Sequence, residues 1–117
     1  MKQILIVDDS TFQRKIVQKI VSAAGFQTEQ ASNGQECLQA LERERFDLVL
    51  LDLNMPEMDG FQVLESMSGN EYAVPVIVLT ADIQNTTRQR CMNLGAENVL
   101  NKPPKQEELL QEVDRLL

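Results

Sequence analysis

Short apolar runs alternate along the chain with stretches in which apolar residues recur at helical spacing. Three runs, at 4–7, 48–51 and 76–79, are continuously apolar and predict strands buried on both faces. Two mixed runs, at 27–31 and 98–100, predict strands at the edges of the same sheet. The pattern therefore predicts five short strands, of which three are central.

Helical patterns separate and follow these strands. The predicted helices lie at 12–24, from 33–34 through Leu41, in the short stretch 61–67, at about 85–94 and at 107–117. Strands that alternate with helices favour a parallel sheet covered on both faces. Right-handed crossovers then favour the strand order 2-1-3-4-5, with strands numbered along the chain, which is the doubly wound, flavodoxin-like α/β arrangement.

Composition supports one domain over residues 1–117 and narrows the function classes. The chain has 117 residues, 43% of them hydrophobic, which suits one compact core. A formal charge of −7 argues against binding of nucleic acid or of an anionic membrane by this domain. Without histidine, Ser-His-Asp and Cys-His pairs and histidine-based zinc sites are excluded.

Location and redox state also follow from the sequence as expectations. No apolar run approaches the roughly 18 residues of a membrane span, and the first residues do not form a signal peptide. Cys37 and Cys91 match no metal-binding spacing and are expected to be reduced, buried or half-buried thiols. These features indicate a cytoplasmic protein.

Polar residues collect at the predicted strand ends. Asp8 and Asp9 follow the first strand, Asp52 the third and Thr80 the fourth, and the fifth runs into Lys102. Because sites of this fold class lie beyond the carboxyl ends of the strands, all five residues are expected in one crevice. Three carboxylates repel one another, and Mg²⁺, which prefers oxygen ligands, relieves that repulsion.

The same set of side chains suits a phosphoryl group. Lys102 adds a positive charge and Thr80 a hydroxyl donor, and the absence of histidine leaves a carboxylate as the nucleophile. Taken singly, each aspartate fits a turn or helix cap, Thr80 a cap and Lys102 a surface charge. The prediction rests on their combination at the ends of four strands.

The sequence resembles the CheY-like receiver domains of two-component response regulators. The matching stretches are 4–10, 48–60, 75–81, 95–96 and 101–103. The resemblance implies that Asp52 is the phosphoacceptor and that Thr80 and Lys102 hold phosphoryl oxygens. For the metal it implies Asp9 as a direct Mg²⁺ ligand, Asp8 acting mainly through water, and Asn54 as the donor of a backbone carbonyl. It also implies a cis peptide bond before Pro103.

The function implied by this resemblance is that of a phosphorylation-dependent signalling switch. The phosphoryl group comes from a phosphohistidine on a partner, a sensor histidine kinase or histidine phosphotransfer protein, or from a small phosphodonor. Phosphorylation then changes the face formed by the helix at 85–94, the strand at 98–100 and the helix at 107–117, which regulates a downstream protein. Such a domain assists its own phosphorylation and dephosphorylation and does not turn over a substrate.

Some positions depart from the family pattern or adjust it. The family usually has an aromatic residue three positions before the lysine, where this chain has Val99, so coupling to the output face is expected to be weak or to follow another route. Asp82 is polar, and we expect it to orient a water and give moderately quick self-dephosphorylation.

Basic residues of the last two helical regions suggest either a docking surface or a solvated face. These residues are Arg88, Arg90, Lys105 and Arg115. Arg14, near the start of the first helix, is expected to be exposed.

Three other classes compete with this prediction. A haloacid-dehalogenase-type phosphatase needs a second aspartate two positions after its nucleophile, where this chain has Asn54. A flavodoxin-type FMN carrier needs a phosphate loop rich in glycine and hydroxyl groups after the first strand, where Asp8-Asp9-Ser10 would repel phosphate. A passive docking module would not need the complete acidic set.

Overall fold

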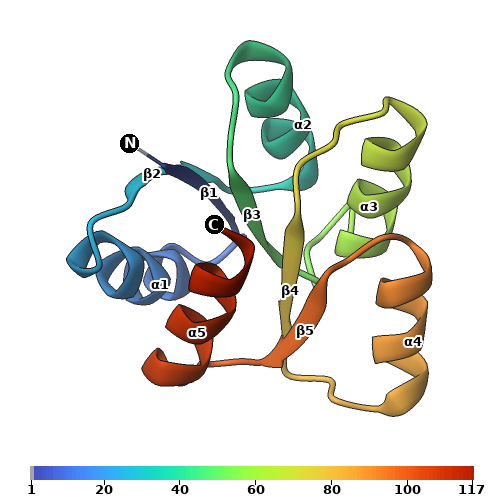
Figure 1. Cartoon of the computed structure of the whole chain (residues 1–117). Coiled ribbons are helices and arrows are strands. Elements are labelled where there is room, and N and C mark those ends of the chain that lie inside the picture. The colour runs from blue at the N-terminus through green and yellow to red at the C-terminus, as the bar shows by residue number, and fades with distance from the viewer. Residues whose placement is uncertain (1) are drawn as a thin grey trace.

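The computed structural model describes residues 2–117, so Met1 of the predicted domain lies outside the described residues. Five parallel strands form one sheet in the order β2-β1-β3-β4-β5, which confirms the predicted topology (Figure 1). The strands are β1 (Gln3–Val7), β2 (Gln27–Ala31), β3 (Leu48–Asp52), β4 (Val76–Thr80) and β5 (Asn98–Asn101). The helices are α1 (Thr11–Ala23), α2 (Gly34–Arg43), α3 (Gly60–Gly69), α4 (Asn85–Asn93) and α5 (Gln106–Leu116).

Two apolar layers cover the sheet because successive side chains of a strand point to opposite faces. In β1, Ile4 and Ile6 pack with buried residues of α1 and α5, whereas Leu5 and Val7 pack with those of α2, α3 and α4. Figure 1 shows α1 and α5 on one side of the sheet and the other three helices on the opposite side. A strand buried on both faces must be apolar throughout, which explains the continuous runs in the sequence.

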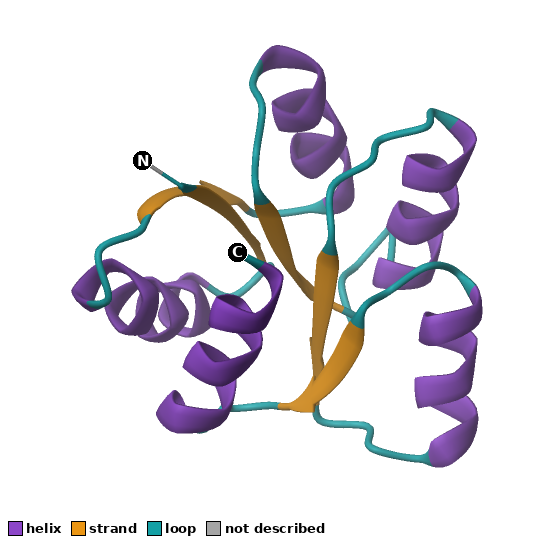
Figure 2. Ribbon diagram, viewed as in Figure 1, coloured by secondary structure: helices purple, strands orange, loops and turns teal. Residues whose placement is uncertain are grey.

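The strands run in the same direction, so their carboxyl ends meet at one edge (Figure 2). Most observed element bounds lie within a residue or two of the predicted ones, and side-chain caps account for part of the difference. The Ser10 side chain accepts a hydrogen bond from the Gln13 backbone N–H, so α1 begins at Thr11.

Other expectations concern the cysteines and membrane association. Cys37 and Cys91 are buried free thiols in the layer of α2, α3 and α4, as predicted. Within residues 2–117, none of the helices combines the length and the apolar character needed to cross a bilayer.

Candidate functional site

The candidate site lies at the sheet edge where the carboxyl ends of the strands meet. Asp8 follows β1, Asp52 ends β3, Thr80 ends β4 and Lys102 follows β5. Asp8, Asp52 and Thr80 are only 4%, 3% and 0% exposed, in a chain whose buried side chains are otherwise mainly apolar. Buried carboxylates are uncommon and require compensation, so this edge of the sheet is chemically unusual.

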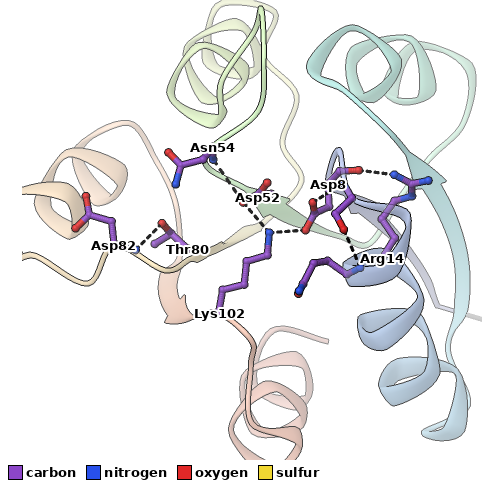
Figure 3. Close-up of polar contacts among 9 residues, drawn as sticks. Asp8, Arg14, Asp52, Asn54, Thr80, Asp82 and Lys102 are labelled. Carbon is purple, nitrogen blue, oxygen red and sulfur yellow. Dashed lines mark hydrogen bonds and ion pairs between the residues drawn. The ribbon is translucent and has the colours of Figure 1, made fainter.

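Lys102 supplies part of that compensation. Its Nζ lies 2.7 Å from Asp8 Oδ2 and 3.1 Å from Asp52 Oδ1, so the ammonium bridges the two buried carboxylates (Figure 3). Burial lowers the pKa of Lys102, but its hydrogen bonds with Asp8 and Asp52 and their charges outweigh that effect and raise it. The peptide bond between Lys102 and Pro103 is cis, as the resemblance implies.

The Asp52 carboxyl is not fully compensated by this lysine. Burial, and then the negative charge of Asp8, raise the pKa of Asp52 to about 6, against the opposing effect of Lys102. The Asn54 backbone N–H also points to Asp52 Oδ1, at the long distance of 3.4 Å. The site therefore holds more negative charge than its own cation neutralises.

The carboxylates lie close enough together to share a cation. One carboxylate oxygen from each of Asp8, Asp9 and Asp52 lies within 4.8 Å of the other two, with Asp9 on the exposed side. Three carboxylates against the Lys102 ammonium leave a formal charge of −2. Hard oxygen donors with this charge fit a divalent cation such as Mg²⁺.

Thr80 lies next to this cluster but makes its contacts toward the β4–α4 loop. Its Oγ1 accepts a hydrogen bond from the Asp82 backbone N–H at 3.1 Å, and its carbonyl accepts one from the Lys102 backbone N–H at 2.9 Å. The Asp82 carboxylate accepts hydrogen bonds from the Gln84 N–H at 3.1 Å and from Thr87 Oγ1 at 2.7 Å. Figure 3 shows Asp82 on the far side of Thr80 from Lys102. Its two hydrogen bonds connect the loop to α4.

The expectation that Arg14 is exposed is wrong. Arg14 is half-buried, and its Nη1 donates a hydrogen bond to the Asp8 carbonyl oxygen at 2.6 Å (Figure 3). Its Nε donates to Gln30 Oε1 at 2.9 Å and its Nη2 to Thr11 Oγ1 at 3.2 Å. A positive charge in the first turn of a helix is unfavourable because it opposes the helix dipole. In the sequence, this unfavourable position of Arg14 was the one indication that its side chain has partners outside α1.

The basic residues on α4 and α5 mostly have partners within the chain. Arg88 Nη1 donates to the Val99 carbonyl oxygen at 3.1 Å, and the Arg90 guanidinium lies 3.8 Å from the centroid of the Phe61 ring. Arg115 pairs with Glu112 at 2.8 Å. These contacts favour the interpretation of a solvated face with local pairing over that of a basic docking surface.

Comparison with known proteins gives a consistent result. The family profile described as "Response regulator receiver domain" matches residues 4–114. The sensor histidine kinase RcsC of Escherichia coli is 34% identical over 100 residues, which cover 86% of this chain and 10% of the kinase. The regulatory protein AtoC of the same species is 36% identical over 117 residues, covering 100% of this chain and 25% of that protein. The chain thus spans about a tenth to a quarter of these curated relatives.

Solved structures of similar proteins share the whole fold. The chemotaxis protein CheY4 of Vibrio cholerae superposes with a TM-score of 0.92 at 34% identity, covering 100% of this chain and 99% of that one. A chain of the CheX-CheY-BeF3-Mg²⁺ complex from Borrelia burgdorferi gives a TM-score of 0.93 at 30% identity, covering 98% of this chain and 88% of that one.

Proposed function

The chain belongs to the family of response regulator receiver domains, which are phosphorylation-dependent switches, and from this premise we propose that Asp52 is its phosphoacceptor. The observation that carries the proposal is the Asp52 carboxylate itself, which is buried at the end of the central strand β3 with the Lys102 Nζ at 3.1 Å. Membership of this family leaves the phosphatase and FMN-carrier alternatives without support.

We propose that Asp8, Asp9 and Asp52 hold Mg²⁺, together with the Asn54 backbone carbonyl. Receiver domains generally bind this ion at an acidic pocket, and the three carboxylates described above provide one. The bound ion supplies positive charge that offsets the negative charge of the transferring phosphoryl group.

The side chains have distinct parts in the proposed transfer. An Asp52 oxygen forms the new bond to phosphorus while the bond from phosphorus to the donor nitrogen or oxygen breaks. The Lys102 ammonium, already 3.1 Å from Asp52, holds a phosphoryl oxygen. Thr80 Oγ1 can donate its proton to another oxygen while it accepts the Asp82 N–H, because a hydroxyl does both.

In this proposal the phosphoryl donor and the target lie outside the 117 residues of this sequence. These residues include no histidine, so the phosphohistidine lies on a sensor histidine kinase or a histidine phosphotransfer protein, or a small phosphodonor takes its place. A shift of Thr80 toward the phosphoryl group moves the Asp82 N–H that it binds, and with it the Thr87 end of α4. We propose that this shift changes the face formed by α4, β5 and α5, to which a downstream protein binds. We also propose that residues 1–117 form a single cytoplasmic domain and that this domain turns over no substrate.

Phosphorylation by a small donor tests this proposal directly. We expect acetyl phosphate to add one phosphoryl group to the wild-type chain, seen by intact mass, only when Mg²⁺ is present. Asp52→Asn should abolish the adduct, and Asp114→Asn, at an exposed position on α5, should leave it unchanged. The assignment fails if the wild type gains no Mg²⁺-dependent adduct, or if Asp52→Asn still gains it.

A further inference from the structure

Arg14 connects three elements beside the acidic cluster. Its guanidinium donates to the Asp8 carbonyl oxygen after β1 (Figure 3). It also donates to Gln30 Oε1 on the edge strand β2 and to Thr11 Oγ1 at the start of α1. The contact with Asp8 is the shortest of the three, at 2.6 Å. A planar guanidinium with several fixed N–H donors fits such a three-point arrangement, which an ammonium cannot reproduce.

The contact with Asp8 completes a set of bonds around that residue. The Asp8 N–H donates to the Ala31 carbonyl at 3.1 Å, Oδ1 accepts from the Ser10 N–H at 2.9 Å, and Oδ2 pairs with Lys102 at 2.7 Å. Arg14 holds the remaining polar atom, the carbonyl oxygen. Every polar atom of Asp8 therefore has a partner, and its orientation is fixed from four directions.

Fixing the Asp8 carbonyl also orients Asp9. The peptide unit that joins the two residues is planar, so the direction of the Asp8 carbonyl determines where the Asp9 N–H and Cα lie. Asp9 is exposed and its carboxylate has a place in the cluster with Asp8 and Asp52. The hydrogen bond from Arg14 thus bears on the backbone position of Asp9, a residue to which it does not bond.

We propose that Arg14 is a positioning residue for the divalent-cation site, acting through the Asp8–Asp9 peptide; this inference rests on the proposed function of the acidic cluster. If Arg14 acted only through its charge, its removal would change the Mg²⁺ affinity in the opposite direction. A guanidinium beside three carboxylates repels a cation, so removing its charge alone would strengthen Mg²⁺ binding. Loss of positioning weakens Mg²⁺ binding, because partners that orient metal ligands contribute to metal affinity.

The test is a Mg²⁺ titration of the purified chain, in which NMR signals of the backbone amides of residues 8–10 report binding. We expect Arg14→Ala to weaken Mg²⁺ binding about tenfold. Arg14→Lys should recover part of the loss, because an ammonium can reach one of the three partners. Lys15→Ala is the matched charge control, since Lys15 is the exposed neighbour on α1, and it should bind Mg²⁺ as tightly as the wild type or slightly more tightly.

A second pair of variants removes the charge from the comparison. Gln30→Ala deletes the partner of Arg14 Nε and leaves every charge in place, and we expect about threefold weaker Mg²⁺ binding. Gln27→Ala, at an exposed position on the same strand, should have no effect. If Arg14→Ala fails to fold, Gln30→Ala and Arg14→Lys decide the question.

Thermal unfolding without Mg²⁺ distinguishes an effect of Arg14 on the cation site from an effect on the stability of the fold. A merely structural role would lower the melting temperature of Arg14→Ala and leave the dissociation constant for Mg²⁺ unchanged in the folded protein. The inference is overturned if Arg14→Ala and Gln30→Ala bind Mg²⁺ as tightly as the wild type. A wild-type chain that binds no Mg²⁺ overturns the proposed cation site and this inference together, so the two failures are distinguishable.

Discussion

Replacing Asp52 by asparagine is expected to stabilise the folded chain at neutral pH when no divalent cation is present. Burial and the Asp8 charge raise the pKa of Asp52 to about 6 in the folded protein, from an ordinary value of 3.8. The folded chain therefore holds the Asp52 proton more tightly than the unfolded chain does. Protonated Asp52 favours folding below pH 3.8, and that advantage is lost as the pH rises through about 6.

The magnitude follows from the two pKa values. Ionising Asp52 in the folded chain costs about 3 kcal/mol of unfolding free energy at pH 8, at about 1.4 kcal/mol for each tenfold change in proton affinity. At pH 5 the same calculation gives about 1.5 kcal/mol, because part of the folded population keeps the proton. Asparagine has nearly the same shape and no charge, so Asp52→Asn should gain these amounts relative to the wild type.

The assay is urea unfolding at pH 5, 6, 7 and 8 with a chelator present. Circular dichroism is the suitable probe, because the chain has no tryptophan and one tyrosine. Subtracting the wild-type free energy from that of the variant cancels groups that titrate equally in both proteins. The advantage of Asp52→Asn should widen by about 1.5 kcal/mol between pH 5 and pH 8.

Asp114→Asn provides the surface control. Its unfolding free energy should stay within about 0.5 kcal/mol of that of the wild type at every pH. Saturating Mg²⁺ should narrow the gap between Asp52→Asn and the wild type, because a ligand that binds only the folded state stabilises it by mass action. An advantage that is absent at pH 8, or that does not change with pH, would refute the electrostatic reasoning.

Two further predictions concern the loops around the site. In Gly60→Ala the new Cβ lies 2.8 Å from backbone of the β3–α3 loop, and urea unfolding should show a loss of about 3 kcal/mol. In Gly34→Ala the new Cβ meets side chains only, the flexible Met58 at 2.7 Å and the fully buried Val63 at 2.9 Å, so the loss should be smaller, about 2 kcal/mol. Thr87→Val removes the hydrogen bond that is the largest cause lowering the pKa of Asp82, so an NMR titration of that carboxyl should show its pKa rising toward 3.8. Equal losses in the glycine variants, or an unmoved Asp82, would contradict these two arguments.

The strand order was predictable because burial on both faces leaves a clear mark on a sequence. The central strands β1, β3 and β4 are almost wholly apolar, while β2 carries exposed polar residues and lies at an edge. Element ends were less predictable, because they depend on caps such as the Ser10 side chain at the start of α1. The pattern of apolar residues says little about such single hydrogen bonds.

The acidic part of the site was predictable for a related reason. Asp8, Asp52 and Lys102 each end or directly follow a strand, and a parallel sheet brings strand ends together regardless of side-chain detail. Arg14 was missed because its long side chain reaches from α1 to the loop after β1 and to β2, and sequence spacing does not fix that reach. The Arg90 contact with Phe61 joins α4 to α3 and was hidden in the same way.

The energetic cost predicted for Asp52 and the positioning proposed for Arg14 have a common origin. The carboxylates of a site with a formal charge of −2 repel one another, so keeping them together without full neutralisation requires groups that fix their positions. Lys102 neutralises one charge, whereas the positive charge of Arg14 is directed at a carbonyl oxygen. Orientation and neutralisation are thus carried out by different side chains, and the remaining charge suits the divalent cation that we propose for this site.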